Sequence, residues 1–198
     1  NQQIMADDDQ DEKGNIFDSA SGNCTESTEH ENTTKFDFTL LDDPSKEGFI
    51  ENLEKAKNEV KRFQYPELST SLTKAIQHKP DDNVIIAIYS LILYFVQQDL
   101  SIYIALAKAS FFHSMIMTTE PMKKLCIEIL GLLFRNNPKL IKVSFTKSIT
   151  TLIQFDPESM IIMLCHYINN LPPQEDSFPV IGIFIDQSDS FFGTQSET

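Results

Sequence analysis

The chain has 198 residues, of which 41% are hydrophobic and 23% charged, and its formal net charge is −13. That is enough apolar sequence for one core of ordinary size, and the negative charge argues against a nucleic-acid-binding protein. The longest apolar run, Val84 to Val96, has thirteen residues, whereas a membrane-spanning helix needs about 20. We therefore expect no membrane span. Three cysteines without a C-x-x-C pair favour a reducing, cytoplasmic location.

Most of the negative charge lies near the N-terminus. Residues 1–44 contain twelve acidic and two basic side chains, whereas residues 45–198 contain seventeen acidic and fourteen basic ones. The first 35 residues are polar and acidic, and such a segment cannot bury enough surface to offset the entropy cost of ordering. We predict a disordered acidic linker over 1–35, whose end docks onto the first helix through Phe36, Phe38, Leu40 and Leu41. Since the chain begins at Asn1 and not at Met, we expect it to be cut from a longer polypeptide.

Residues 36–187 predict a helical-repeat domain. The first four helices are expected to begin at Asp43-Pro44, at Pro66, at Asp81 or Asp82, and at about Leu100. Apolar residues recur in them at spacings of three and four, as on one face of a helix. In the first helix this stripe is Phe49, Leu53, Ala56, Val60 and Phe63, and the fourth helix is expected to extend to Met117. The third helix is apolar almost all round, which predicts an inner helix covered on several sides.

Three further helices each start at a proline that follows a capping residue. They are expected from Thr119 and Pro121 to Phe134, from Asn137-Pro138 to Leu152, and from Asp156-Pro157 to Ile168. An Asn, Thr or Asp in that place supplies an N-cap acceptor. The short apolar segment from Phe178 to Ile185 predicts a final helix or an extended segment, and residues 188–198 are expected to be a frayed tail.

A self-similarity at an offset of 39 residues runs from Val84 to Leu171. It aligns Leu91 with Leu130, Leu93 with Leu132, Phe95 with Phe134, and Cys126 with Cys165. A period near 40 built from helices is typical of armadillo and HEAT repeats. The predicted fold is therefore all-α, an armadillo- or HEAT-like right-handed superhelix (α-solenoid) of about seven helices, with an irregular helical bundle as the alternative. Cys126 and Cys165 are interpreted as small apolar core residues, with a disulfide between them as the alternative.

A search for catalytic, cofactor-binding and metal-binding patterns finds none. The six glycines form no phosphate-binding loop, and the histidines (His30, His78, His113, His166) are scattered. A nucleophilic pair of Cys126 and His166 stays open, because spatial partners are invisible in a sequence. A loose basic cluster on the fifth and sixth helices is interpreted as a solvated surface, with an acidic partner or the chain's own linker as alternatives. It consists of Lys123, Lys124, Arg135, Lys139, Lys142 and Lys147.

From Phe36 to about Gly193 the chain resembles an armadillo-like helical region that accompanies the kinase domain in expanded families of protist, trichomonad-type, protein kinases. The resemblance is carried by ordered segments, namely 36–44, 48–54, 80–85, 120–122 and 178–181, although Phe178 stands where that family has Trp. It implies a non-catalytic binding or regulatory region, with an ATP-dependent kinase domain in the same polypeptide but outside these residues.

The sequence thus predicts a non-catalytic module that binds an unidentified protein partner, without cofactor, metal or nucleic acid. Two alternatives stay open. One is a stand-alone scaffold or assembly subunit with no kinase attached, and the other is a small enzyme that uses the cysteines and histidines.

Overall fold

The computed structural model describes residues 35–141, 145–171 and 178–187, and the regular structure in these ranges is all helical. The all-α prediction is confirmed. The predicted linker, apart from Lys35, and the predicted tail lie outside the described residues. Three short 3₁₀ turns in the described chain are η1 Phe38–Leu41, η2 Arg62–Gln64 and η3 Pro138–Leu140. The α-helices in these ranges are α1 Phe49–Glu59, α2 Tyr65–Gln77, α3 Asp82–Gln98, α4 Ile102–Lys108, α5 Phe111–Ser114, α6 Glu120–Asn136, α7 Thr146–Phe155, α8 Pro157–Asn170 and α9 Phe178–Asp186.

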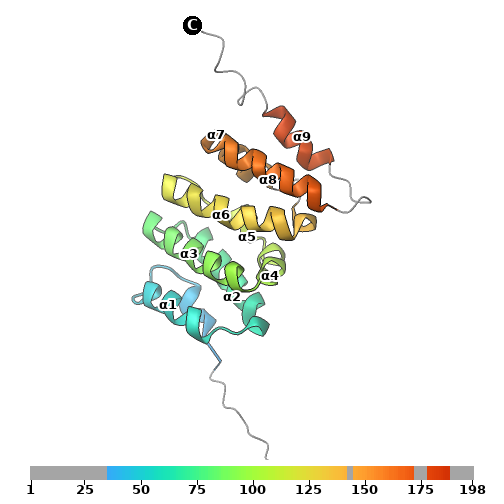
Figure 1. Cartoon of the computed structure of the whole chain (residues 1–198). Helices are drawn as coiled ribbons and strands as arrows, with labels where there is room; N and C mark the ends of the chain where they lie inside the picture. Colours follow the sequence, from blue (N-terminus) through green and yellow to red (C-terminus); the bar gives the residue numbers. More distant parts are fainter. Residues whose placement is uncertain (1–34, 142–144, 172–177, 188–198) are drawn as a thin grey trace, which may run out of the picture. The chain divides into compact units, whose positions relative to one another are not determined.

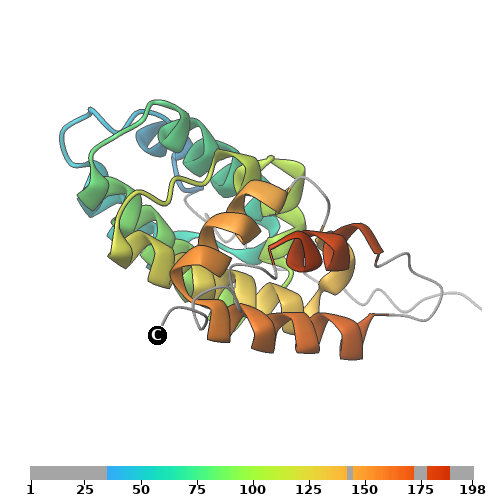
Figure 2. The ribbon, with the colours of Figure 1, turned by 90° about the horizontal axis from the view of Figure 1, so that it is seen from above.

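Four helices form a row in which each contacts the next. Helix α1 packs against α3, α3 against α6, and α6 against α8, and Figure 1 shows the four side by side. The other helices cover this row: α2 contacts α4 and α5, and α7 contacts α8 and α9. Seen from above (Figure 2), α7 and α9 lie on the same side of α8. Among the described residues, no helix is long and apolar enough to cross a membrane.

The helices of the row begin at intervals slightly shorter than the 39-residue offset of the self-similarity in the sequence. Helices α3, α6 and α8 begin at Asp82, Glu120 and Pro157, which are 38 and 37 residues apart. Between α3 and α6 the pattern of buried residues repeats at an offset of 38 residues. At an offset of 39 the buried Val96 would instead align with the exposed Arg135. The buried pairs at 38 are Ile88 with Cys126, Leu91 with Ile129, Ile92 with Leu130, Phe95 with Leu133, and Val96 with Phe134.

The N-terminal part of the described chain begins with η1, which packs on α1 and α2. Phe36, Phe38 and Leu41 are buried there, as predicted, whereas Leu40 is 38% exposed. Asp37 stabilises the turn, because its carboxylate accepts hydrogen bonds from the backbone N–H and the hydroxyl of Thr39 at 3.0 and 2.7 Å.

The predicted first helix is wrong at both ends. It begins at Phe49, after Gly48 in the left-handed conformation, and ends at Glu59. The buried side chain of Gln64 accepts a hydrogen bond from the backbone N–H of Lys61 at 2.9 Å and so closes the turn η2. Because the helix has already ended, Phe63 does not join its apolar stripe and is 71% exposed.

The predicted fourth helix is broken in two. Ser110 has a positive φ of 59° between α4 and α5, and the chain is extended after Ser114. After the break, Phe111 and Phe112 begin α5; both are buried, and their rings pack edge to face with centroids 5.9 Å apart. Phe111 packs edge-on against Tyr89 with ring centroids 6.1 Å apart, and Phe112 lies 4.9 Å from Phe145.

The predicted helix from Asn137-Pro138 also starts later. Those residues form the short turn η3, Ile141 is extended, and α7 begins at Thr146. Of the predicted N-caps, Asp156 accepts a hydrogen bond from the backbone N–H of Ser159 at 3.1 Å. The side chains of Asp81, Thr119 and Asn137 make no such bond. The segment from Phe178, which was predicted as a helix or an extended stretch, is the helix α9.

Candidate functional site

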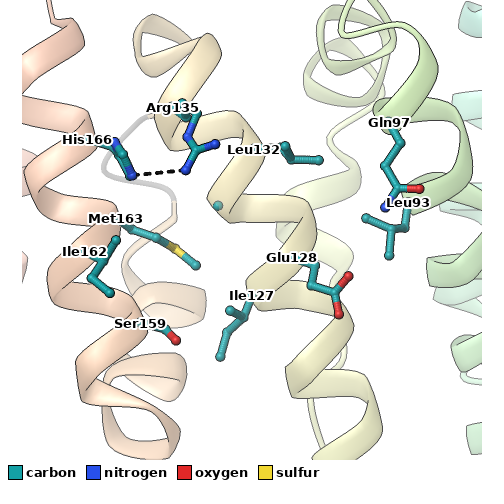
Figure 3. A pocket seen from close by; sticks show the side chains of 11 residues that line it. Leu93, Gln97, Ile127, Glu128, Leu132, Arg135, Ser159, Ile162, Met163 and His166 are labelled. Atoms are coloured by element: carbon teal, nitrogen blue, oxygen red, sulfur yellow. Dashed lines mark hydrogen bonds between the residues drawn. The ribbon is translucent and has the colours of Figure 1, made fainter.

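A groove of about 380 Å³ runs along the exposed side of the row formed by α3, α6 and α8. Figure 3 shows α6 in the middle, with α3 and α8 on either side. The three helices contribute residues that recur at spacings of three and four, so that each helix presents one stripe to the groove. The stripe residues are Leu93 and Gln97 on α3, Ile127, Glu128, Gly131, Leu132 and Arg135 on α6, and Ser159, Ile162, Met163 and His166 on α8.

The stripe on α6 is exposed because the opposite side of the helix forms the core. Cys126, Ile129, Leu130 and Leu133 are all fully buried, which orients α6 and leaves the intervening positions for the groove. At the centre of the stripe Gly131 has no side chain, and a Cβ built there would lie 3.3 Å from the Cε of Met163. Gly131 therefore lets α8 pack close to α6 and leaves a shallow position in the groove floor.

The floor of the groove is apolar. Leu93, Ile127 and Leu132 are half-buried, and Ile162 is 52% exposed. Met163 is almost fully buried at 5% exposure, but its end reaches the groove (Figure 3). A methionine adapts its shape to a ligand more easily than a branched side chain does. Exposed apolar residues that gather in a concave surface and are bordered by polar groups are typical of interaction sites.

The polar residues lie toward the two ends of the α6 stripe. Arg135, close to the C-terminus of α6, places Nη2 3.3 Å from Nε2 of His166 on α8, as Figure 3 shows. A guanidinium can only donate hydrogen bonds, so Arg135 is the donor in this contact and Nε2 of His166 accepts. Glu128 lies two helical turns earlier. Within the described residues, neither Glu128 nor Arg135 forms an ion pair.

A second apolar surface surrounds the exposed Phe63. It has a volume of about 520 Å³ and is lined by Phe63, Tyr65, Pro66 and the 48%-exposed Ile104. Two cations also line it, Lys108 and Arg62, and Arg62 is paired with Asp99 at 3.2 Å. This surface lies on η2, α2 and α4, apart from the α3, α6 and α8 residues that line the groove.

The two residues of the suggested nucleophilic pair, Cys126 and His166, lie in different environments. Cys126 is fully buried in α6, and burial raises the pKa of its thiol, which disfavours the reactive thiolate. His166 lies in the groove, in contact with Arg135. Cys165 is exposed, so its interpretation as a core residue is wrong. Among the described residues, no three His, Cys, Asp or Glu side chains are grouped so that they could hold a metal ion.

The members of the loose basic cluster have different neighbours. Lys124 pairs with Glu120 on its own helix at 2.6 Å, and Lys123 lies over the ring of Phe155 at 5.1 Å. Arg135 belongs to the groove, and Lys142 lies outside the described residues. Among the histidines, His78 and His113 are exposed at the end of α2 and on α5. Sequence reasoning did not find the groove, although Leu93 and Leu132 were aligned by the repeat.

Comparison with known proteins finds no matching family model, no matching curated protein and no matching solved structure.

Proposed function

We propose that this chain is a non-catalytic helical-repeat module that binds a peptide segment of a partner protein in the groove on α3, α6 and α8. The observation that carries the proposal is the alignment of apolar stripes on three successive helices of one row. A continuous surface of this kind suits an elongated ligand, because each helix offers the same type of contact to the next part of the ligand.

The proposed architecture is an armadillo- or HEAT-like solenoid. Its support is the row α1, α3, α6 and α8, in which three successive helices begin 38 and 37 residues apart. In repeat proteins of this kind each repeat contacts only its neighbours, and stacked repeats bury one continuous core.

Peptide selection followed by matched substitutions tests the function. Peptides that bind the protein are selected from a random display library, and their affinities are measured by isothermal titration calorimetry. Ile162→Asp places a charge in the groove at a residue that is already 52% exposed, and Ile50→Asp makes the same change on α1 at 42% exposure. We expect Ile162→Asp to weaken binding at least about tenfold, since it removes apolar contact and buries a charge. Equal affinities for the two variants, or a library that yields no binder, would contradict the proposal.

The resemblance to kinase-associated helical regions leads to a separate proposal, that the parent polypeptide also carries a protein kinase domain. In that arrangement the groove would recruit a substrate or a regulator. The reading frame upstream of the codon for Asn1 tests this proposal. A frame that starts there, without kinase motifs elsewhere in the gene, would favour a stand-alone scaffold.

A further inference from the structure

The charges of the groove are arranged along one stripe of α6. Glu128 and Arg135 are seven residues apart, which places them on the same side of the helix and two turns apart. At a rise of 1.5 Å per residue this corresponds to about 10 Å along the axis. Gly131 lies between them, and the end of Met163 packs over it. The groove therefore has an acidic position, an apolar centre and a basic position in that order.

Within the described residues, neither charged group is paired with an opposite charge. Within the described residues no carboxylate pairs with Arg135, and its hydrogen-bond partner there is Nε2 of His166 at 3.3 Å. This contact orients the guanidinium across the space between α6 and α8, as Figure 3 shows, and leaves several of its donors unused. Arg135 also lies in the last turn of α6, where the partial negative charge of the helix C-terminus attracts its guanidinium. A planar guanidinium with unused donors is suited to a carboxylate.

We propose that the groove selects peptides with a large apolar side chain between a carboxylate and a cationic group. This inference rests on the proposed function and names the chemistry of its partner. The apolar side chain lies over Gly131 against Met163 and Leu132, the carboxylate binds Arg135, and a Lys or Arg of the peptide binds Glu128. The spacing of about 10 Å corresponds to about three residues in an extended peptide or about seven in a helical one.

A double-mutant cycle tests the carboxylate contact. The probe is a peptide obtained from the library selection, compared with the same peptide in which its acidic residue is replaced by the corresponding amide. Both peptides are titrated into wild-type protein, Arg135→Gln and Lys55→Gln, which removes one exposed cation from α1 as a matched control. We expect the amide peptide to bind the wild type about fivefold more weakly, the upper range for an exposed ion pair. The two peptides should bind Arg135→Gln equally well.

The outcomes separate the two proposals. If the selected peptides need Ile162 but show no coupling between their carboxylate and Arg135, the groove binds peptides and the charge assignment is wrong. If the coupling is seen equally in Lys55→Gln and disappears only in Arg135→Gln, the assignment holds. If no peptide needs Ile162, the proposed function and the charge assignment both fail.

Discussion

Replacement of Tyr89 by Phe tests how the segment that follows α5 is attached to the core. The Tyr89 hydroxyl accepts a hydrogen bond from the backbone N–H of Ile116 at 2.7 Å and donates one to the carbonyl oxygen of the same residue at 2.9 Å. Tyr89 is fully buried on α3, and Ile116 belongs to the extended stretch that follows α5. One side chain thus satisfies both backbone groups of a residue that has no helical partners.

The expected loss follows from these two bonds. Tyr89→Phe keeps the ring and its contact with Phe111 but leaves the N–H and C=O of Ile116 without their partner. Each net hydrogen bond contributes about 1 kcal/mol, so we expect the free energy of unfolding to fall by about 2 kcal/mol. Tyr94→Phe on the same helix is the control, because the described residues give the Tyr94 hydroxyl no hydrogen bond, and only its ring contacts Phe95 and Lys57.

Urea unfolding of the two variants, with hydrogen exchange at the Ile116 amide, measures the effect. The slope of the unfolding free energy with urea should stay unchanged, since both variants bury nearly the same surface. The reasoning would be refuted if Tyr89→Phe lost no more than about 0.5 kcal/mol relative to Tyr94→Phe, the range of a surface substitution. It would also be refuted if the Ile116 amide kept its protection.

Three further predictions concern the groove, the cysteines and pH. Gly131→Ala should raise the free energy of unfolding by about 0.5 kcal/mol, because alanine favours the helix and the flexible end of Met163 can move aside. The added methyl group should fill the groove floor and weaken peptide binding. Urea unfolding and calorimetry measure the two effects, and an unchanged peptide affinity would contradict the assignment of the groove. With Cys24 replaced by Ser, a thiol reagent should modify Cys165 in the native protein and Cys126 only after unfolding. Mass spectrometry of the labelled peptides distinguishes the two cysteines. Labelling of Cys126 in the native protein would argue against its burial. Stability should fall above about pH 10, because burial raises the pKa of Tyr103 in the folded state while the unfolded chain releases its proton. Urea midpoints measured across this range should decline less steeply in Tyr103→Phe than in the wild type. An identical decline in the two proteins would refute the prediction.

Local pattern was sufficient to predict where α3, α6 and α8 begin, whereas α1 was predicted with the wrong ends. The start of α8 at Asp156-Pro157 combines a capping carboxylate with a proline in the first turn, and both signals lie within four residues of sequence. The length of the apolar run after Asp82 predicts only one structure, a helix covered on several sides. Such elements need no information from distant parts of the chain.

The errors arise where distant residues decide the local structure. The chain leaves the helical conformation at Ser110 because Tyr89 and Phe145, far away in sequence, bind the residues that follow. No signal around Ser110 indicates this. Likewise, Phe63 fits the spacing of an apolar stripe, but α1 ends at Glu59 and Val60 is already extended.

The groove was predictable only in part. The repeat aligned Leu93 with Leu132, but at 39 residues, whereas burial repeats at 38 between α3 and α6. An error of one residue turns a helix by about 100°, enough to exchange core and groove positions. Gly131, between four large apolar neighbours in the sequence Ile-Leu-Gly-Leu-Leu, is the signal that could have marked a close approach of helices.

The most direct test of the central claim is a methionine-methyl NMR titration with a selected peptide. Met163 ends in the groove, whereas Met160 on the same helix is fully buried and Met115 lies after α5. We expect the Met163 signal to shift with the dissociation constant found by calorimetry, while the Met115 signal stays in place, and we expect no shift in Ile162→Asp. A peptide that saturates the protein and leaves the Met163 signal unmoved would contradict the assignment of the groove on α3, α6 and α8 as the binding site.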